Sequence, residues 1–153
     1  MTTPEQKLAE LGLSLPDVPT PAGAYVPAVR SGDHVYTSGQ LPFVDGKLTR
    51  TGKLGAGVTT EEAAALARVC ALNAVAALKS EVGDLSRVVR IVKVVVFVAS
   101  DPAYTEQPKV GNGASELLAE VFGDLGRHAR SAVGVAVLPL DSPVEVELIA
   151  EVS

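Results

Sequence analysis

The densest group of potentially reactive side chains lies in the segment Gly126 to Ser131, which reads Gly-Arg-His-Ala-Arg-Ser. It places Arg127, His128 and Arg130 at the start of a predicted strand, directly after a helix and its terminating glycine. Arginine suits carboxylate recognition because its planar guanidinium can donate two parallel charge-assisted hydrogen bonds. The segment is therefore a candidate anion site. The alternative is a solvated basic loop, since surface arginines are common.

A pair of carboxylates follows on the last predicted strand. Glu145 and Glu147 are two residues apart, so both side chains lie on the same face of that strand. Either carboxylate can lie near Arg130, on a neighbouring strand or on a neighbouring subunit, and orient a water molecule by accepting its proton. The alternative is an ordinary exposed strand face.

The remaining polar candidates predict neither a metal nor a nucleotide cofactor. The only histidines, His34 and His128, are far apart in the sequence, which disfavours a histidine-rich metal site. The glycines between residues 46 and 57 do not form a phosphate-binding motif. Cys70 has an inward helical position typical of an inert core residue. Asn73, on the same helix, can bond a strand carbonyl, bond a neighbouring subunit or face solvent.

Length and composition favour one globular domain. The chain has 153 residues, of which 47% are hydrophobic and 20% charged, whereas disordered chains lack enough apolar surface to fold. The net charge of -5 opposes binding to nucleic acid. The most apolar run, Val88 to Ala99, is interrupted by Arg90 and Lys93, so no membrane span is expected. The charged amino terminus and the single cysteine predict a cytoplasmic protein.

The elements that must position these residues are predicted from periodicity and turn signals. A capping box at Thr59 opens one helix, which Gly83 ends, and Pro108 is expected to precede a second helix as a breaker. Pro27 makes the first strand an edge strand, and the strand after Gly83 is expected to be covered on both faces. In chain order the strands and helices are Ala24–Val29, His34–Ser38, the helix to Val82, Val88–Ala99, the helix Asn112–Phe122, Ser131–Leu138 and Val144–Val152.

This order predicts an α+β fold, with two helices packed on one face of a mixed or largely antiparallel sheet. Residues 43–58 are predicted to form a long loop with one short edge strand. Residues 1–22 are predicted to be a helical arm followed by an extended linker with Pro16, Pro19 and Pro21, and residues 23–153 a single domain. The last strand alternates between apolar residues and the face that carries Glu145 and Glu147.

Three segments together resemble the RidA (YjgF-like) family of reactive-intermediate deaminases. They are Tyr36-Thr37-Ser38-Gly39-Gln40-Leu41-Pro42, the run Val92–Val98, and Ala129-Arg130-Ser131-Ala132-Val133 continuing through Leu138-Pro139 to Val144-Glu145-Val146-Glu147. The similarity runs from about Ala24 to the end of the chain. This resemblance implies a chorismate-mutase-like fold and a homotrimer with three clefts between its subunits.

The resemblance also implies an activity, the hydrolysis of reactive 2-imino acids to 2-keto acids and ammonia without a cofactor. By similarity Arg130 binds the substrate carboxylate and Glu145 positions water. The residues expected to contact substrate are Tyr25, Ser38, Gly39, Asn112, Ser131 and Ala132. Many relatives have cysteine where this chain has Ala132, which removes a thiol but keeps the backbone contacts. The alternatives are a non-catalytic trimer that binds a small carboxylate and, disfavoured by the acidic balance, an endoribonuclease.

Overall fold

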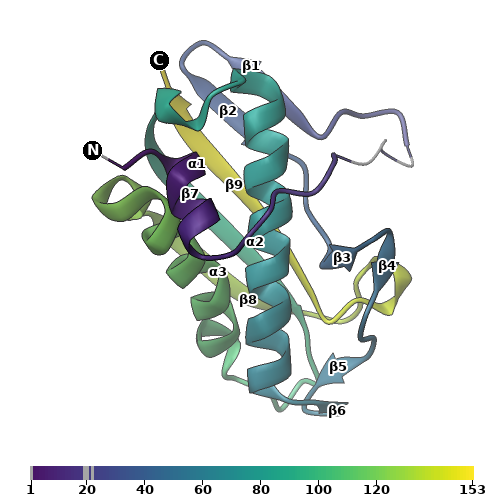
Figure 1. The fold of residues 1–153 in the computed structure, drawn as a ribbon. Coiled ribbons are helices and arrows are strands. Elements are labelled where there is room, and N and C mark those ends of the chain that lie inside the picture. Colours follow the sequence, from purple (N-terminus) through teal and green to yellow (C-terminus); the bar gives the residue numbers. More distant parts are fainter. Residues whose placement is uncertain (1, 19–20, 22) are drawn as a thin grey trace.

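Five strands form one mixed sheet in the order β1–β2–β9–β7–β8 (Figure 1). The computed structural model describes residues 2–18, 21 and 23–153. The strands are β1 (Ala28–Ser31), β2 (His34–Thr37), β7 (Val88–Ala99), β8 (Ala129–Val135) and β9 (Val144–Val152). Neighbours are antiparallel except for β7 and β8, which are parallel. The predicted α+β architecture with a mixed sheet is confirmed.

Two long helices, α2 (Thr60–Val82) and α3 (Gln107–Phe122), lie side by side on one face of this sheet (Figure 1). Gly113 allows their close approach, because a Cβ atom there would lie only 2.7 Å from the carbonyl carbon of Ala64 on α2. The two helices and the sheet face beneath them enclose the hydrophobic core. The predicted packing of two helices on one face is confirmed.

Helix α2 begins and ends where the sequence predicts. Thr59 and Glu62 form the capping box, and Gly83 ends the helix with a positive φ of 80°. By length and composition α2 could cross a membrane, but most of it is buried inside the fold. It is the core helix of a soluble protein.

Helix α3 begins five residues earlier than predicted. The expectation that Pro108 breaks the chain is wrong, because Pro108 lies in the first turn, where a backbone N–H has no intrahelical partner to lose. Asn112 therefore lies within the helix and not at its start. This placement matters for the site, because it fixes the face of the helix on which Asn112 lies.

One face of the sheet is left without helices. Along β9 every second residue from Val144 to Val152 is buried, which confirms the predicted alternation. Along β7, Val94, Val96 and Val98 are buried, whereas Val95 and Phe97 on the other face remain partly exposed. The expectation that this strand is covered on both faces is therefore wrong for the single chain. We call the side without helices the uncovered face.

The predicted hairpin and the strand after α3 differ from the structure only at their ends. Strand β1 begins at Ala28 and not at Ala24, since Pro27 has no N–H to pair. It is an edge strand, as predicted. Strand β8 runs from Ala129 to Val135, so it begins two residues and ends three residues before the predicted strand Ser131–Leu138.

The loop between Phe43 and Val58 contains two short strand pairs where one edge strand is predicted. Strands β3 (Phe43–Val44) and β4 (Lys47–Leu48) are antiparallel, and β5 (Lys53–Leu54) and β6 (Gly57–Val58) are parallel. Asn73 of α2 donates to the carbonyls of Leu41, at 3.0 Å, and Phe43, at 3.2 Å. Of the alternatives for Asn73, the structure shows the bond to backbone carbonyls of the same chain.

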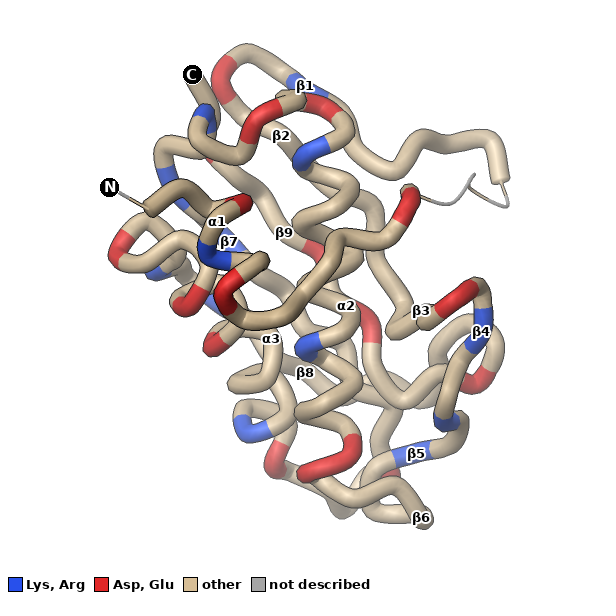
Figure 2. The backbone as a smooth tube through the Cα atoms, in the orientation of Figure 1, with Lys and Arg blue, Asp and Glu red and all other residues tan. Residues whose placement is uncertain are grey.

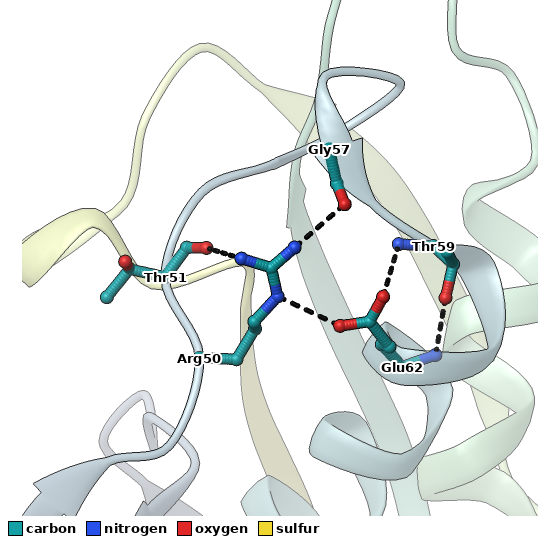
Figure 3. Close-up of polar contacts among 5 residues, drawn as sticks. All are labelled: Arg50, Thr51, Gly57, Thr59 and Glu62. Carbon is teal, nitrogen blue, oxygen red and sulfur yellow. Dashed lines mark hydrogen bonds and ion pairs between the residues drawn. The ribbon is translucent and has the colours of Figure 1, made fainter.

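Arg50 ties the same loop to the first turn of α2 (Figure 3). Its Nε donates to Glu62 Oε2 at 2.9 Å, its Nη2 to the carbonyl of Gly57 at 2.7 Å and its Nη1 to that of Thr51 at 3.2 Å. The hydrogen bond from Arg50 to Glu62, together with those from Thr59, lowers the pKa of the Glu62 carboxyl. The loop is thus held at its middle as well as at its ends.

A short helix, α1 (Pro4–Glu10), packs against α3 and lies near the end of α2. Leu8 is only 4% exposed and belongs to the hydrophobic core. Glu5 accepts hydrogen bonds from the backbone N–H of Leu85, at 2.7 Å, and from Lys79, at 3.4 Å. The predicted linker rests partly on Pro19, which lies outside the described residues.

Candidate active site

Arg130 lies on the helix side of the sheet, beside α3. It pairs with the buried Val94 across β7 and β8, so the two side chains share a face. Its Nη1 donates to Asn112 Oδ1 at 2.9 Å and to Ser115 Oγ at 3.1 Å, and its Nη2 donates to the carbonyl of Pro108 at 3.3 Å. Three groups of one helix therefore fix the plane of the guanidinium.

These contacts leave part of the guanidinium available to a ligand. Arginine carries five N–H donors, and both Nη1 hydrogens and one Nη2 hydrogen are engaged. Within the described part of the chain, the Nε–H and the second Nη2–H donate to no protein group. Two such donors on adjacent nitrogens match the two oxygens of a carboxylate.

The absence of a side chain at Gly111 leaves room for the Arg130 guanidinium against α3. A Cβ atom at this position would lie 3.1 Å from Nη1 and 3.2 Å from Cζ of Arg130. The same Cβ would lie 3.4 Å from that of Ala132, which is therefore a neighbour of Arg130 on the helix side. The residue type at position 111 thus sets how closely Arg130 can approach α3.

Glu145 lies on the uncovered face, opposite Phe97 of β7. Its carboxyl group rests against Gly39, where a Cβ atom would lie 2.8 Å from Cδ and 3.2 Å from Cγ of Glu145. Partial burial, and then the negative charge of Glu147 on the same face, raise the pKa of Glu145. A carboxyl group with a raised pKa can exchange a proton with water more readily near neutral pH.

Backbone hydrogen bonds place Gly39 beside Glu145. Gln40 and Val146 exchange both of their N–H···O bonds, at 2.8 and 3.0 Å. Ser38 donates through its backbone N–H to the carbonyl of Pro27 and through its hydroxyl to that of Val26. The adjacent Tyr25 is 57% exposed. Three of the predicted site residues therefore lie near the start of β9: Ser38, Gly39 and Glu145.

The predicted site residues fall into two groups on opposite sides of the sheet. Arg130, Asn112 and Ala132 lie on the helix side, and Ser131 lies on the uncovered face, where its hydroxyl accepts from Lys93 at 3.2 Å. Glu145 also lies on the uncovered face. Of the two placements considered from the sequence, a neighbouring strand of the same chain does not bring Glu145 to Arg130.

Ser115 and Gly111 are neighbours of Arg130 that sequence reasoning missed. A signal for Ser115 was present, because it follows Asn112 by three residues and so shares its face of the helix. His128, which the sequence singles out, has its Nε2 2.9 Å from Ser115 Oγ and its Nδ1 2.6 Å from the carbonyl oxygen of Gly126. Arg127 is exposed at the same strand entry.

Other chemistry-bearing groups lie apart from these residues. Cys70 is fully buried, and burial, followed by the charge of Glu145, raises the pKa of its thiol well above the ordinary value. It is a core residue, as predicted. Among the described residues, no three histidine, cysteine, aspartate or glutamate side chains gather closely enough to hold a metal ion.

Comparison with known proteins places the chain among relatives of the same length. The family model "YjgF/chorismate_mutase-like, putative endoribonuclease" matches residues 5–152. Protein TCP17 of Trypanosoma cruzi is 50% identical over 147 residues, covering 95% of this chain and 92% of that protein. The crystal structure of Atu1372 from Agrobacterium tumefaciens, a protein of unknown function, superposes with a TM-score of 0.92 at 45% identity, over 99% of this chain and 94% of that one.

A relative with a named activity is less similar. The 2-iminobutanoate/2-iminopropanoate deaminase of Dermatophagoides farinae is 32% identical over 137 residues, which cover 90% of this chain and 92% of that protein. The model match spans nearly the whole sequence, and the superposed sheet and helices agree with it. The chain therefore belongs to the YjgF/RidA family, in a divergent subgroup with TCP17 and Atu1372.

Proposed function

We propose that this protein hydrolyses reactive 2-imino acids to 2-keto acids and ammonia, in a cleft between subunits of a cytoplasmic homotrimer. The observation that carries the proposal is the hydrogen bonding of Arg130. Its guanidinium is fixed by three hydrogen bonds to α3, yet two of its N–H donors remain available for a substrate carboxylate. The named activity of the mite relative supports the same class of reaction.

The proposed reaction needs positioning more than strong acid or base chemistry. Arg130 holds the carboxylate, and backbone groups near Ala132 hold the imine nitrogen. As the oxygen of a water molecule bonds to the imine carbon, Glu145 accepts a proton from that water and passes it to the imine nitrogen. Collapse of the resulting carbinolamine breaks the carbon–nitrogen bond and releases ammonia, which leaves the keto acid. The raised pKa of Glu145 suits this proton transfer.

A second copy of the chain is part of the proposal, because one chain does not bring Arg130 and Glu145 together. The uncovered face carries Val29, Tyr36 and Val133, which are 51%, 43% and 44% exposed. Exposed apolar side chains on a flat sheet favour a contact with another subunit. Packing of this face beside the edge strand β8 of the next subunit would bring Glu145 of one subunit towards Arg130 of the other.

Two alternative functions can be distinguished from imine hydrolysis by experiment. A non-catalytic trimer could use the same Arg130 to bind a small carboxylate without turnover. The family description also includes an endoribonuclease. The chain has a net charge of -5, and Figure 2 shows Lys and Arg positions interspersed with Asp and Glu positions over the described backbone. This distribution disfavours a polyanion.

The test measures keto-acid release from freshly generated iminopyruvate, corrected for spontaneous hydrolysis. We expect the wild-type chain to accelerate release and Arg130→Ala to lose at least about tenfold in kcat/KM, as expected for loss of hydrogen bonds to a charged group. Arg127→Ala is the matched control, because it removes an equal charge from an exposed position. Binding of 2-oxobutanoate without acceleration by the wild type would favour the non-catalytic alternative, and RNA cleavage would favour the nuclease.

A further inference from the structure

We propose that Ser115 and His128 form a positioning pair that orients the substrate-binding guanidinium of Arg130. This inference rests on the proposed function, because it concerns how Arg130 is prepared to receive a carboxylate. Neither residue is expected to touch substrate. Their role is to decide which Arg130 hydrogens are occupied and which are left for the ligand.

The bonding partners fix the tautomer of His128. The carbonyl oxygen of Gly126 can only accept, so His128 Nδ1, 2.6 Å away, carries the hydrogen. In the neutral ring Nε2 is then an acceptor. Ser115 Oγ lies 2.9 Å from Nε2, and its hydroxyl hydrogen must point there. The backbone at Gly126 thereby sets the direction of a side-chain bond on α3.

That direction exposes the lone pairs of Ser115 to Arg130. Because its hydrogen points to His128, Ser115 Oγ can accept from Arg130 Nη1, at 3.1 Å. Asn112 Oδ1 takes the other Nη1 hydrogen at 2.9 Å. With Nη1 fully occupied, the guanidinium is held so that Nε–H and an Nη2–H face away from these partners. The pair thus selects the edge of Arg130 that is offered to a carboxylate.

The local contacts of Ser115 are not those that a helical serine makes by default. A serine within a helix commonly donates its hydroxyl to the carbonyl four residues earlier, a bond that needs no partner outside the helix. The Ser115 hydroxyl instead bridges His128, which directly precedes β8, and Arg130 on β8. Its two partners come from outside the helix, which points to a role in arranging them and not in stabilising α3.

The experiment compares Ser115→Ala and His128→Ala with Ser115→Thr and His128→Gln, since threonine keeps the hydroxyl and glutamine can offer an amide oxygen in place of Nε2. For iminopyruvate we expect the alanine variants to raise KM about fivefold, the effect of one lost hydrogen bond, with little change in kcat. The conservative variants should restore KM. Glu116→Gln, an exposed neighbour on α3, is the matched control.

A second readout does not depend on turnover. At mildly alkaline pH the nitrogen NMR spectrum of the full-length protein should show His128 as the Nδ1–H tautomer, with its Nε2 signal shifted in Ser115→Ala. His34→Gln identifies the signals of the other histidine. The Nη signals of Arg130 should lose their protection from exchange in both alanine variants.

The outcomes separate this inference from the proposed function. An active wild type and an inactive Arg130→Ala, with unchanged KM in both alanine variants, would overturn the positioning pair alone. An Nε2–H tautomer for His128 would overturn it whatever the activity. If the wild type does not hydrolyse imines, the proposed function fails, and the tautomer and the Arg130 signals still decide whether the pair orients the guanidinium.

Discussion

Two glycines on α3 have different neighbours, although they are only two residues apart. At Gly111 the space that a Cβ atom would occupy is bounded by the tip of Arg130, and at Gly113 by the backbone of α2. Neither glycine has the positive φ that would exclude alanine. The same substitution therefore probes ligand binding at one position and helix packing at the other.

We expect Gly111→Ala to weaken substrate binding and to leave the fold intact. Alanine favours a helix over glycine, so Tm should be unchanged or higher, while the new methyl group displaces Arg130 by a few tenths of an ångström and raises KM. Gly113→Ala should instead cost about 1–3 kcal/mol of stability through overpacking. Thermal unfolding and KM, measured on both variants, check this; an equal loss of Tm in both would contradict it.

The charge of Glu147 sets part of the pH dependence proposed for Glu145. Glu147 is a cause, after burial, of the raised pKa of Glu145, so Glu147→Gln should lower that pKa. In the proposed mechanism Glu145 must be ionised, so hydrolysis should fall as pH drops through its pKa. The acid limb of kcat should therefore move to lower pH in Glu147→Gln. A limb that stays in place or moves to higher pH would show that another group controls it.

At the scale of elements, local signals account for most of the fold. The capping box at Thr59, the glycine stop at Gly83 and the alternation along β9 are set by neighbouring residues, and each is where the sequence predicts it. The start of α3 is not, because a proline suits both a break and a first helical turn. The same error removed the part of the helix that carries Pro108 and Gly111, so these two neighbours of Arg130 could not be predicted, whereas Asn112 and Ser115 lie within the predicted helix.

The anchor between Arg50 and Glu62 gives a prediction for the loop between Phe43 and Val58. In the wild type at neutral pH, Glu62 is ionised and bonded to the Arg50 guanidinium, which also bonds the carbonyl of Gly57. Arg50→Ala removes these bonds and should therefore increase amide exchange around Gly57 at neutral pH. The lowered pKa of Glu62 means that this stabilisation is present above the ordinary carboxyl pKa and is lost as pH falls through the lowered value. The wild type and the variant should therefore converge in acid. Lys47→Ala, in the same loop, is the control.

At the scale of the molecule, the assembly was inferred from family resemblance and not from the pattern of residues. The sequence shows that Glu145 and Glu147 share a face, but it does not show which face Arg130 occupies, since that depends on how β8 pairs with β7. The uncovered face could not be predicted from the periodicity of apolar residues, for a similar reason. A continuous apolar strand such as β7 looks the same whether a helix or another subunit covers it.

Mixing two inactive variants tests whether the site is divided between subunits. In the proposed homotrimer, Arg130→Ala and Glu145→Gln should each be inactive when every subunit carries the same substitution. After unfolding and refolding together, subunits that keep Glu145 can meet subunits that keep Arg130, and about a quarter of the clefts in a random equal mixture should be intact. Regained keto-acid release is the expected result. The same proteins refolded separately and then combined are the control, and no recovery in the mixed sample would contradict a site divided between subunits.

The separation of Arg130 and Glu145 by the thickness of the sheet also bears on how such an enzyme would behave in dilute solution. In a dissociated subunit the Arg130 side chain would still have its partners on α3, yet the subunit would hold only half of each reaction centre. Turnover per chain would then rise with protein concentration. Total turnover would therefore rise more steeply than in proportion to the amount of protein. A cell would obtain little detoxification from trace expression and full activity only once the chain is abundant enough to assemble.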